Sequence, residues 1–201
     1  MLYIVTGGSG SGKSEYAEQI AVQCRNRTGG TLWYLATMRI WDDEGRKRVE
    51  RHRRMRAAKG FETIERYTGL ETLELREKFE EPNPAGLDAE RKTDSLKHWE
   101  SCQVAQKPVL LLECMSNLVL NEFYDQKNGA EERILQGIKH LQKQCRDLII
   151  VTNEIFSDGM TYDPESERYI QLLGRINREL GQMADSVTEV VYGIPLAVST
   201  P

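Results

Sequence analysis

The sequence predicts an α/β domain in which a mainly parallel sheet is flanked by helices. Short apolar runs alternate with longer segments of helical periodicity along the 201 residues. These runs lack regular polar residues, which is typical of parallel strands buried on both faces. A glycine-rich loop separates the first run from the first helical segment. We therefore expect residues 1–201 to form one domain.

The first run, Leu2–Thr6, is predicted to be a buried strand, and helical spacing begins at about Lys13. Residues 31–35 follow as a second strand. A helix is predicted over 42–58, because acidic residues at its start favour the positive end of the helix dipole. Residues 61–65 alternate like a short strand.

The polar segment 66–107 has the weakest pattern of the chain, and we interpret it as a variable helical insertion. Residues 71–81 and 94–106 have helical composition, and the prolines and glycine within 82–86 separate them.

Clear periodicity returns after this segment. Strands are predicted over 108–113, 147–152 and 186–192. Helices are predicted over 131–146 and 164–183, the second with a proline in its first turn.

The composition indicates an ordinary globular protein. Charged residues make up 29% and hydrophobic residues 39%, and the net charge of −4 argues against general nucleic-acid binding. The four cysteines are too widely spaced for a zinc site and too few for a disulfide framework. No apolar run approaches the about 18 residues of a membrane span. The first run has the pattern of a strand and not of a signal peptide, so we expect a cytoplasmic location.

Residues 7–14 match the phosphate-binding motif G-x-x-x-x-G-K-[ST] between a strand and a helix. Glycines allow backbone N–H groups to surround an anion, and the helix N-terminus adds its own donors. Lys13 is expected to reach the β- and γ-phosphates, and Ser14 to bind Mg²⁺. The alternative, a flexible turn before a helix, is less consistent with this order of elements. The predicted nucleotide contacts are Gly7, Gly8, Ser9, Gly10, Ser11, Gly12, Lys13 and Ser14.

A basic segment, residues 46–56, carries a net charge of +6 and contains His52. On a helix, Arg48 and Arg56 lie one turn to either side of His52. Neighbouring cations disfavour the charged imidazole, which keeps it neutral and nucleophilic. Composition alone favours an ordinary solvated helix. A nucleic-acid surface is a third reading, although no aromatic residues interleave the charges.

Carboxylates and amides follow two of the later strands. Glu113 is expected to act with Ser14 on the Mg²⁺ side of the site, or else to cap the following helix. Asn153 and Glu154 either contact a ligand or cap the turn at 157–159. The remaining histidines, His98 and His140, are interpreted as surface helix residues.

Together these segments resemble the bifunctional adenosylcobinamide kinase / adenosylcobinamide-phosphate guanylyltransferase family of cobalamin assembly. The resemblance extends from Leu2 to about Leu196. It is carried by residues 5–14, 34–37, 43–44, 48–56, 63–65, 112–114, Asn117, Asn121, 151–154, Gly174, Asn177, 184–185 and 193–195.

The resemblance implies a single P-loop, RecA-like domain that catalyses two reactions. ATP or GTP phosphorylates the hydroxyl on the aminopropanol arm of adenosylcobinamide. GTP then transfers GMP to that phosphate through a covalent GMP–histidine intermediate, releasing pyrophosphate. The resemblance implies that His52 is this histidine, with Mg²⁺ as cofactor and Lys13 as the second catalytic residue. It also implies a homo-oligomer such as a trimer.

The resemblance implies further nucleotide contacts. They are Ala36, Thr37, Met38, Arg53, Arg54, Met55, Arg56, Glu65 and Glu113.

The sequence departs from the family pattern near these residues. Ala57 replaces a proline, Phe61 replaces a common tryptophan, the spacing between these two positions is one residue longer, and residues 161–163 are inserted relative to some members. Two other hypotheses stay open: a kinase in which His52 is only structural, and a nucleotide-gated module that binds nucleic acid.

Overall fold

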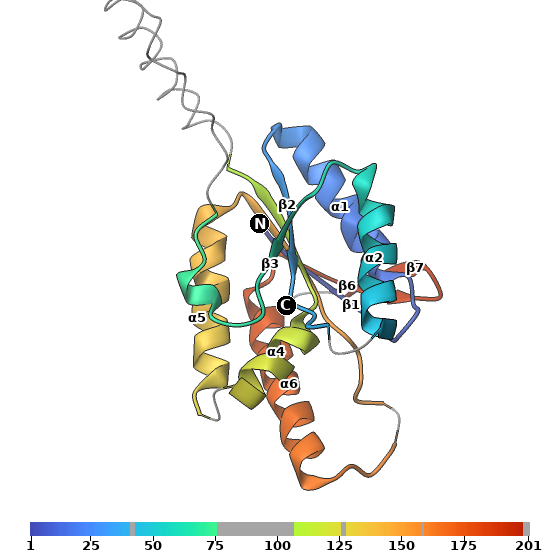
Figure 1. Ribbon diagram of the computed structural model, residues 1–201, viewed down its shortest axis with the longest axis vertical. Coiled ribbons are helices and arrows are strands. Elements are labelled where there is room, and N and C mark those ends of the chain that lie inside the picture. Colours follow the sequence, from blue (N-terminus) through green and yellow to red (C-terminus); the bar gives the residue numbers. More distant parts are fainter. Residues whose placement is uncertain (41–42, 76–106, 126–127, 158, 199–201) are drawn as a thin grey trace, which may run out of the picture.

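A computed structural model describes residues 1–40, 43–75, 107–125, 128–157 and 159–198 (Figure 1). The predicted fold class is confirmed: seven strands form one sheet in the order β3-β2-β4-β5-β1-β6-β7. Pairing is parallel throughout except between β6 and β7. The strands are β1 (Leu2–Thr6), β2 (Leu32–Ala36), β3 (Glu62–Glu65), β4 (Val109–Glu113), β5 (Asp147–Val151), β6 (Ser186–Val191) and β7 (Ile194–Val198).

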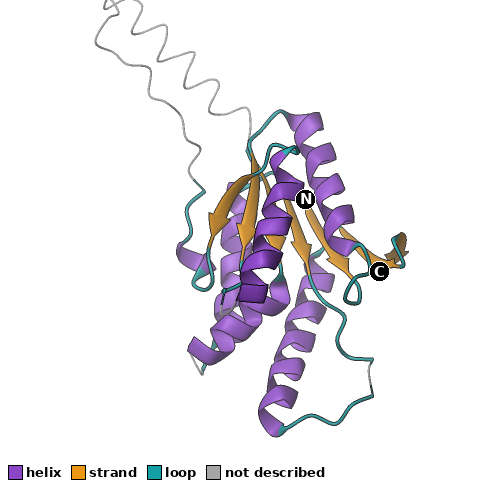
Figure 2. Ribbon diagram, turned by 45° about the vertical axis from the view of Figure 1, so that its right-hand side comes forward, coloured by secondary structure: helices purple, strands orange, loops and turns teal. Residues whose placement is uncertain are grey.

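The helices cover both faces of this sheet, as the continuous apolar strands require (Figure 2). In the described ranges they are α1 (Lys13–Thr28), α2 (Asp43–Ala57), α4 (Met115–Asp125), α5 (Ala130–Gln144), α6 (Pro164–Met183) and the short 3₁₀ helix η1 (Leu70–Thr72). Figure 1 shows α1 and α2 on one side of the sheet and α4, α5 and α6 on the other.

Two apolar cores hold these layers together. On one face, Ala17, Ala21 and Cys24 of α1 pack on sheet residues such as Val5 and Ile149. The core on the other face is larger, because α4, α5 and α6 each contribute a buried apolar stripe. Alternate residues of the central strands therefore enter opposite cores, which explains their unbroken apolar sequences.

Local signals explain where the helices begin and end. The helix α1 ends at Gly29, which adopts a left-handed conformation with φ 76° and donates its N–H to the Arg25 carbonyl. At the start of α6, the Asp163 carboxylate accepts hydrogen bonds from the N–H groups of Glu165 and Ser166, and Pro164 occupies the first turn.

The parallel arrangement brings the ends of several strands to one edge of the sheet. Glu65 and Glu113 are the last residues of their strands, and Ala36 pairs with both across the ladder. The loop of residues 7–12 follows β1 at the same edge. In open α/β sheets this carboxyl edge is where ligands bind.

One predicted element is wrong in its described part. Instead of a helix from Glu71, the chain forms η1 and then extends at Leu73, with φ −82° and ψ 115°. The side-chain amide of Gln144 in α5 explains the difference, because it donates to the Leu73 carbonyl at 2.8 Å and accepts from the Leu75 N–H at 2.7 Å. Residues 76–81 and the predicted helix over 94–106 lie outside the described residues.

The strand β7 was not predicted, and a helix at the position of α4 was expected only as the one that Glu113 would cap, without bounds. Cys24, Cys114 and Cys145 form no disulfide bond in the described structure, whereas Cys102 is outside the described residues. None of the helices in the described part of the chain has the length and apolar composition that crossing a membrane needs.

We expect Gly137→Ala to destabilise the protein. A Cβ at this position in α5 would lie 2.6 Å from the Leu70 Cβ, where η1 packs on the helix. Such overpacking costs about 1–3 kcal/mol of unfolding free energy, measurable by urea denaturation.

The matched control is Gly181→Ala in α6, where a Cβ meets nothing within 4 Å. Alanine is favoured over glycine inside a helix, so this variant should gain about 0.5–1 kcal/mol. Equal effects of the two substitutions would contradict the close packing of η1 on α5.

Candidate active site

The loop between β1 and α1 has a backbone that only glycines permit. Gly7 adopts φ 154°, and a Cβ there would lie 2.5 Å from the Val190 carbonyl oxygen of β6. Gly12 precedes α1 in the left-handed region, with φ 91°, and provides no side-chain cap. The first N–H groups of α1 therefore lack a side-chain acceptor from their N-cap residue, which suits an anion at this position.

Lys13 folds back across this loop. Its Nζ donates to the Gly8 carbonyl at 2.9 Å, and only 8% of the residue is exposed. Burial lowers the pKa of Lys13, an effect that Cys114 and Glu113 oppose. The buried Ser11 hydroxyl has no hydrogen-bond partner among the described residues. A buried ammonium and an unpaired hydroxyl in the same segment fit a polyanionic ligand such as a triphosphate.

The structure brings Ser14 and Glu113 into direct contact. The Ser14 hydroxyl donates to one carboxylate oxygen of Glu113, and the Tyr34 hydroxyl donates to the other at 2.9 Å. The Glu113 carboxylate thus faces the phosphate loop, which favours the first of its two predicted roles over that of a helix cap.

Tyr34 was not identified from the sequence as a site residue. It lies in a run of buried residues in β2, and only its partners in other elements distinguish it. Burial raises the pKa of Tyr34, and the Glu113 charge raises it further. The phenol therefore stays protonated and donates to the carboxylate at neutral pH.

The helix α2 reaches the same cluster through Arg56. The Arg56 guanidinium carbon lies 3.4 Å from the centre of the Tyr34 ring, close enough for a cation–π contact. Arg56 is only 4% exposed, and its Nε and Nη1 have no hydrogen-bond partner in the described part of the chain. Buried guanidinium donors without acceptors fit a phosphate ligand.

His52 lies in α2, one turn before Arg56. Its side chain and that of Met55 are outside the described residues. Arg53 forms an ion pair with Glu65 at the end of β3, whereas the more exposed Arg54 pairs with Glu50 in the helix itself. The Arg53–Glu65 pair therefore joins the helix that carries His52 to the carboxyl edge.

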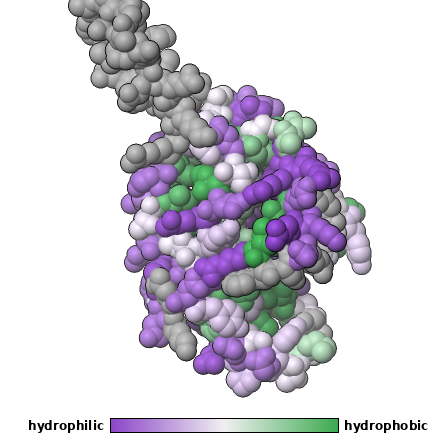
Figure 3. All heavy atoms as spheres, in the orientation of Figure 1, coloured by the Kyte–Doolittle hydropathy of each residue, from purple (hydrophilic) through white to green (hydrophobic). Residues whose placement is uncertain are grey.

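The surface over α2 is strongly hydrophilic (Figure 3), as expected from its sequence DEGRKRVERHRRMRA. Lys59, just after the helix, also pairs with the buried Glu18 of α1. Polar contacts therefore contribute most of the described attachment of α2 to the domain.

The loop after β2 is held by α4 and by Cys114, which precedes it. Thr37 is fully buried, and its hydroxyl donates to the Cys114 carbonyl at 2.8 Å. The Asn121 amide donates to the carbonyls of Thr37 at 2.8 Å and Tyr67 at 3.0 Å. Two loops at the carboxyl edge are thus joined through one side chain, with the half-buried Met38 next in sequence.

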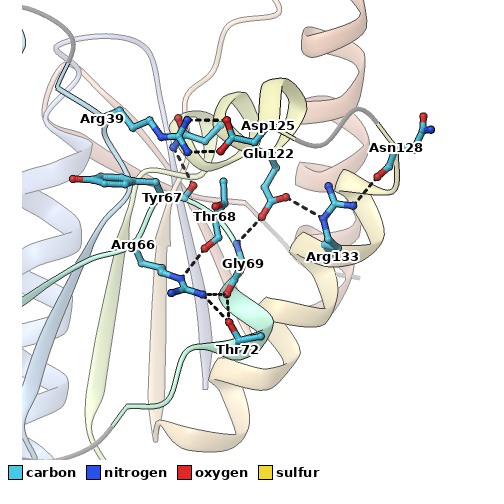
Figure 4. A network of polar contacts seen from close by, with 11 residues as sticks. Arg39, Arg66, Tyr67, Thr68, Gly69, Thr72, Glu122, Asp125, Asn128 and Arg133 are labelled. Atoms are coloured by element: carbon cyan, nitrogen blue, oxygen red, sulfur yellow. Dashed lines mark hydrogen bonds and ion pairs between the residues drawn. The ribbon is translucent and has the colours of Figure 1, made fainter.

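A polar network continues this support (Figure 4). Arg39 forms a two-point contact with Asp125 and lies 5.7 Å above the Tyr67 ring. The hydrogen bond from Arg39 lowers the pKa of Asp125. Glu122, which is 1% exposed, accepts from the Gly69 N–H at 2.7 Å and from Arg133. The network holds the loops after β2 and β3 to α4 and α5.

The residues after β5 have mainly structural partners. The Asn153 amide donates to the Ser116 hydroxyl at 2.6 Å. Glu154 accepts from the Phe156 N–H and the Ser157 hydroxyl, both at 2.9 Å. Of its two predicted roles, Glu154 therefore takes that of a turn cap.

The described side chains next to the phosphate-binding segment would give Mg²⁺ few protein ligands. No group of three or more His, Cys, Asp or Glu side chains in the described ranges could bind a metal ion. The Ser14 hydroxyl oxygen and a Glu113 carboxylate oxygen lie next to each other. This small set fits Mg²⁺, which keeps several waters and takes phosphate oxygens as further ligands.

Comparison with known protein families identifies the relatives of this chain. The family model described as cobinamide kinase / cobinamide phosphate guanyltransferase matches residues 3–85 and 87–198. The chain belongs to this family. Membership confirms the resemblance seen in the sequence and the predicted enzyme class, a kinase that is also a nucleotidyltransferase.

Curated relatives agree over nearly their full length. The bifunctional adenosylcobalamin biosynthesis protein CobU of Escherichia coli K12 is 29% identical over 98% of this chain and 99% of its own. CobU of Salmonella typhimurium LT2 is 26% identical with the same coverage. CobP of Pseudomonas aeruginosa PAO1 is 26% identical over 96% of this chain and 94% of its own. This places the chain in adenosylcobalamin biosynthesis.

Solved structures show a weaker likeness. A KaiC-like protein of Pyrococcus horikoshii OT3 aligns with 94% of this chain and 69% of its own, at 12% identity and a TM-score of 0.43. A similarity this low supports no conclusion about function.

We expect Asn121→Leu to destabilise the edge of the site. It would leave the buried Thr37 carbonyl and the partly buried Tyr67 carbonyl without their amide donor. Losing both bonds should cost about 2 kcal/mol or more in urea denaturation. The control is the same substitution at the exposed Asn26 of α1, which should stay within about 0.5 kcal/mol of the wild type.

Proposed function

We propose that this protein phosphorylates adenosylcobinamide and then transfers GMP from GTP to the product through a covalent GMP–His52 intermediate. One observation carries the proposal. A continuous series of contacts runs from Ser14 in the phosphate-binding segment through Glu113 and Tyr34 to Arg56 in the helix of His52. This arrangement supports one site in which a nucleotide meets both catalytic segments.

In the kinase step, residues 7–14 bind the phosphates of ATP or GTP. Lys13 stabilises the negative charge that develops on the transferred γ-phosphoryl group. Ser14 and Glu113 would hold Mg²⁺, which would supply positive charge against the phosphate groups. The hydroxyl of the corrinoid side arm attacks the γ-phosphorus, the bond to the β-phosphate oxygen breaks, and the hydroxyl proton is lost to solvent or a base.

In the transferase step, a neutral ring nitrogen of His52 attacks the α-phosphorus of GTP. A nitrogen–phosphorus bond forms, and the bond to the pyrophosphate oxygen breaks. An oxygen of the corrinoid phosphate then attacks the same phosphorus, which releases His52 and gives adenosylcobinamide-GDP. The unpaired donors of Arg56 support a role in stabilising the phosphate charge during both attacks.

Several finer points of the function are also proposals. The corrinoid is the small-molecule partner, nucleic acid is not a partner, and the active form is a cytoplasmic homo-oligomer such as a trimer. The ion pairs of Arg53 and Arg54 within the protein favour an enzyme site over a nucleic-acid surface, because they neutralise part of the basic helix.

We expect Lys13→Ala to abolish the kinase step while the fold remains intact. Removing this charge should raise the barrier by on the order of 3 kcal/mol, or about 10²-fold in rate. Transfer of labelled γ-phosphate from ATP or GTP to adenosylcobinamide measures the effect. The exposed Lys139 of α5, changed to alanine, is the control and should retain activity. Near-wild-type phosphorylation by folded Lys13→Ala would exclude the proposed role of Lys13.

We expect His52→Ala to lose the covalent GMP adduct and GMP transfer but to retain phosphorylation of adenosylcobinamide. Arginine side chains cannot replace the imidazole, because a guanidinium stays protonated and is not nucleophilic. Intact mass after incubation with GTP and Mg²⁺ detects the adduct, which should be labile in acid and stable in base.

His140→Ala is the matched control for His52→Ala. His140 lies in α5, where its Nε2 is 3.1 Å from the Leu73 carbonyl oxygen, so this variant should keep the adduct. An adduct that persists in His52→Ala, or that maps to another residue, would leave α2 as a phosphate-binding surface only.

A further inference from the structure

The turn between β6 and β7 contains only Tyr192 and Gly193, because Val191 pairs with Ile194 across the hairpin. Both turn residues have positive φ, 52° for Tyr192 and 77° for Gly193. A two-residue turn with this geometry favours asparagine or glycine at its first position, because a Cβ there crowds the backbone. Within the described residues, Tyr192 is the one non-glycine residue with positive φ.

Packing does not explain a tyrosine at this position. Tyr192 is 94% exposed, so its ring makes almost no contact with its own chain. An exposed aromatic ring in a disfavoured backbone conformation points to a ligand, because local strain is concentrated at functional positions.

The turn is fixed beside the phosphate-binding segment. The Gly193 N–H donates to the Ser11 carbonyl at 2.8 Å. The Gly193 Cα would lie 3.3 Å from a Cβ placed on Gly12. The strand before the turn, β6, pairs in parallel with β1, so both strands end at the same edge. Tyr192 is therefore adjacent to the residues that precede α1.

We propose that the Tyr192 ring stacks on the purine base of a nucleoside triphosphate whose phosphates lie on residues 7–14. The inference rests on the proposed nucleotide binding and adds the contact that binds the base. Adenine and guanine both stack on aromatic side chains, because every base has a flat π-face. The same contact therefore serves ATP and GTP.

The alternative hypothesis is that this hairpin forms a contact between two copies of the chain. Ile194, Leu196 and Val198 of β7 are also exposed. They lie along the strand, however, whereas Tyr192 lies at the turn that contacts the phosphate-binding segment. We therefore assign the ring to the nucleotide, and the oligomeric state becomes a measured outcome of the test.

Two substitutions distinguish the effect of the Tyr192 ring from the effect of the turn conformation. Tyr192→Asn removes the ring and introduces a residue that prefers this turn, so the hairpin should stay folded. Tyr192→Phe keeps the ring. Titration calorimetry with Mg²⁺ compares GTP, ATP and inorganic tripolyphosphate, which has no base, on the full chain.

We expect Tyr192→Asn to weaken GTP and ATP binding about tenfold, the scale of one lost base–aromatic stack. Tripolyphosphate binding should be unchanged in this variant. Tyr192→Phe should bind all three ligands like the wild type.

Two results would overturn the assignment: unchanged GTP affinity in Tyr192→Asn, or an equal loss for GTP and tripolyphosphate. A change of sedimentation with unchanged nucleotide affinity would assign the hairpin to a contact between copies instead. If tripolyphosphate does not bind the wild type, or binds Lys13→Ala equally well, then the nucleotide site itself is misplaced and the proposed function fails with it.

Discussion

The register between β2 and its two neighbours determines where chemistry can occur in this protein. Ala36 pairs with Glu65 on one side and with Glu113 on the other. Because side chains alternate along a strand, a slip of one residue would turn Glu113 to the opposite face of the sheet. Ser14 and Tyr34 would then lose their shared acceptor, and α2 would lose its link to the phosphate-binding segment. The glycine-rich motif alone therefore does not define the site.

Among the described residues, the buried cations of the site outnumber the carboxylates near them. Lys13 and Arg56 are both buried near a single carboxylate, that of Glu113, and Arg56 keeps unpaired donors in the described structure. Burying cations without matching anions is unfavourable. Bound phosphate groups would supply the missing negative charge, so ligand binding should stabilise the fold as well as position the nucleotide.

The sequence was sufficient for the sheet, most helices and the phosphate-binding segment, because these depend on local motifs and short periods. It was insufficient for the extent of α4, whose inward face contains buried polar residues that break the apolar pattern: Ser116, Asn121 and Glu122. All five residues of β7 are exposed, so this strand lacks the alternation of buried and exposed residues by which a strand is predicted. The role of Tyr34 depends on a carboxylate 79 residues away, and no local pattern encodes such a distance.

The interior position of β1 in the sheet has a consequence for how the chain folds. This strand pairs only with β5 and β6, which begin at residues 147 and 186. During synthesis, an apolar strand and its phosphate-binding loop thus emerge long before either neighbour exists. Such distant pairing slows folding and leaves apolar surface exposed to aggregation. Nascent chains should therefore depend on chaperones until β6 has left the ribosome, and truncations before residue 186 should be insoluble although they contain the complete nucleotide motif.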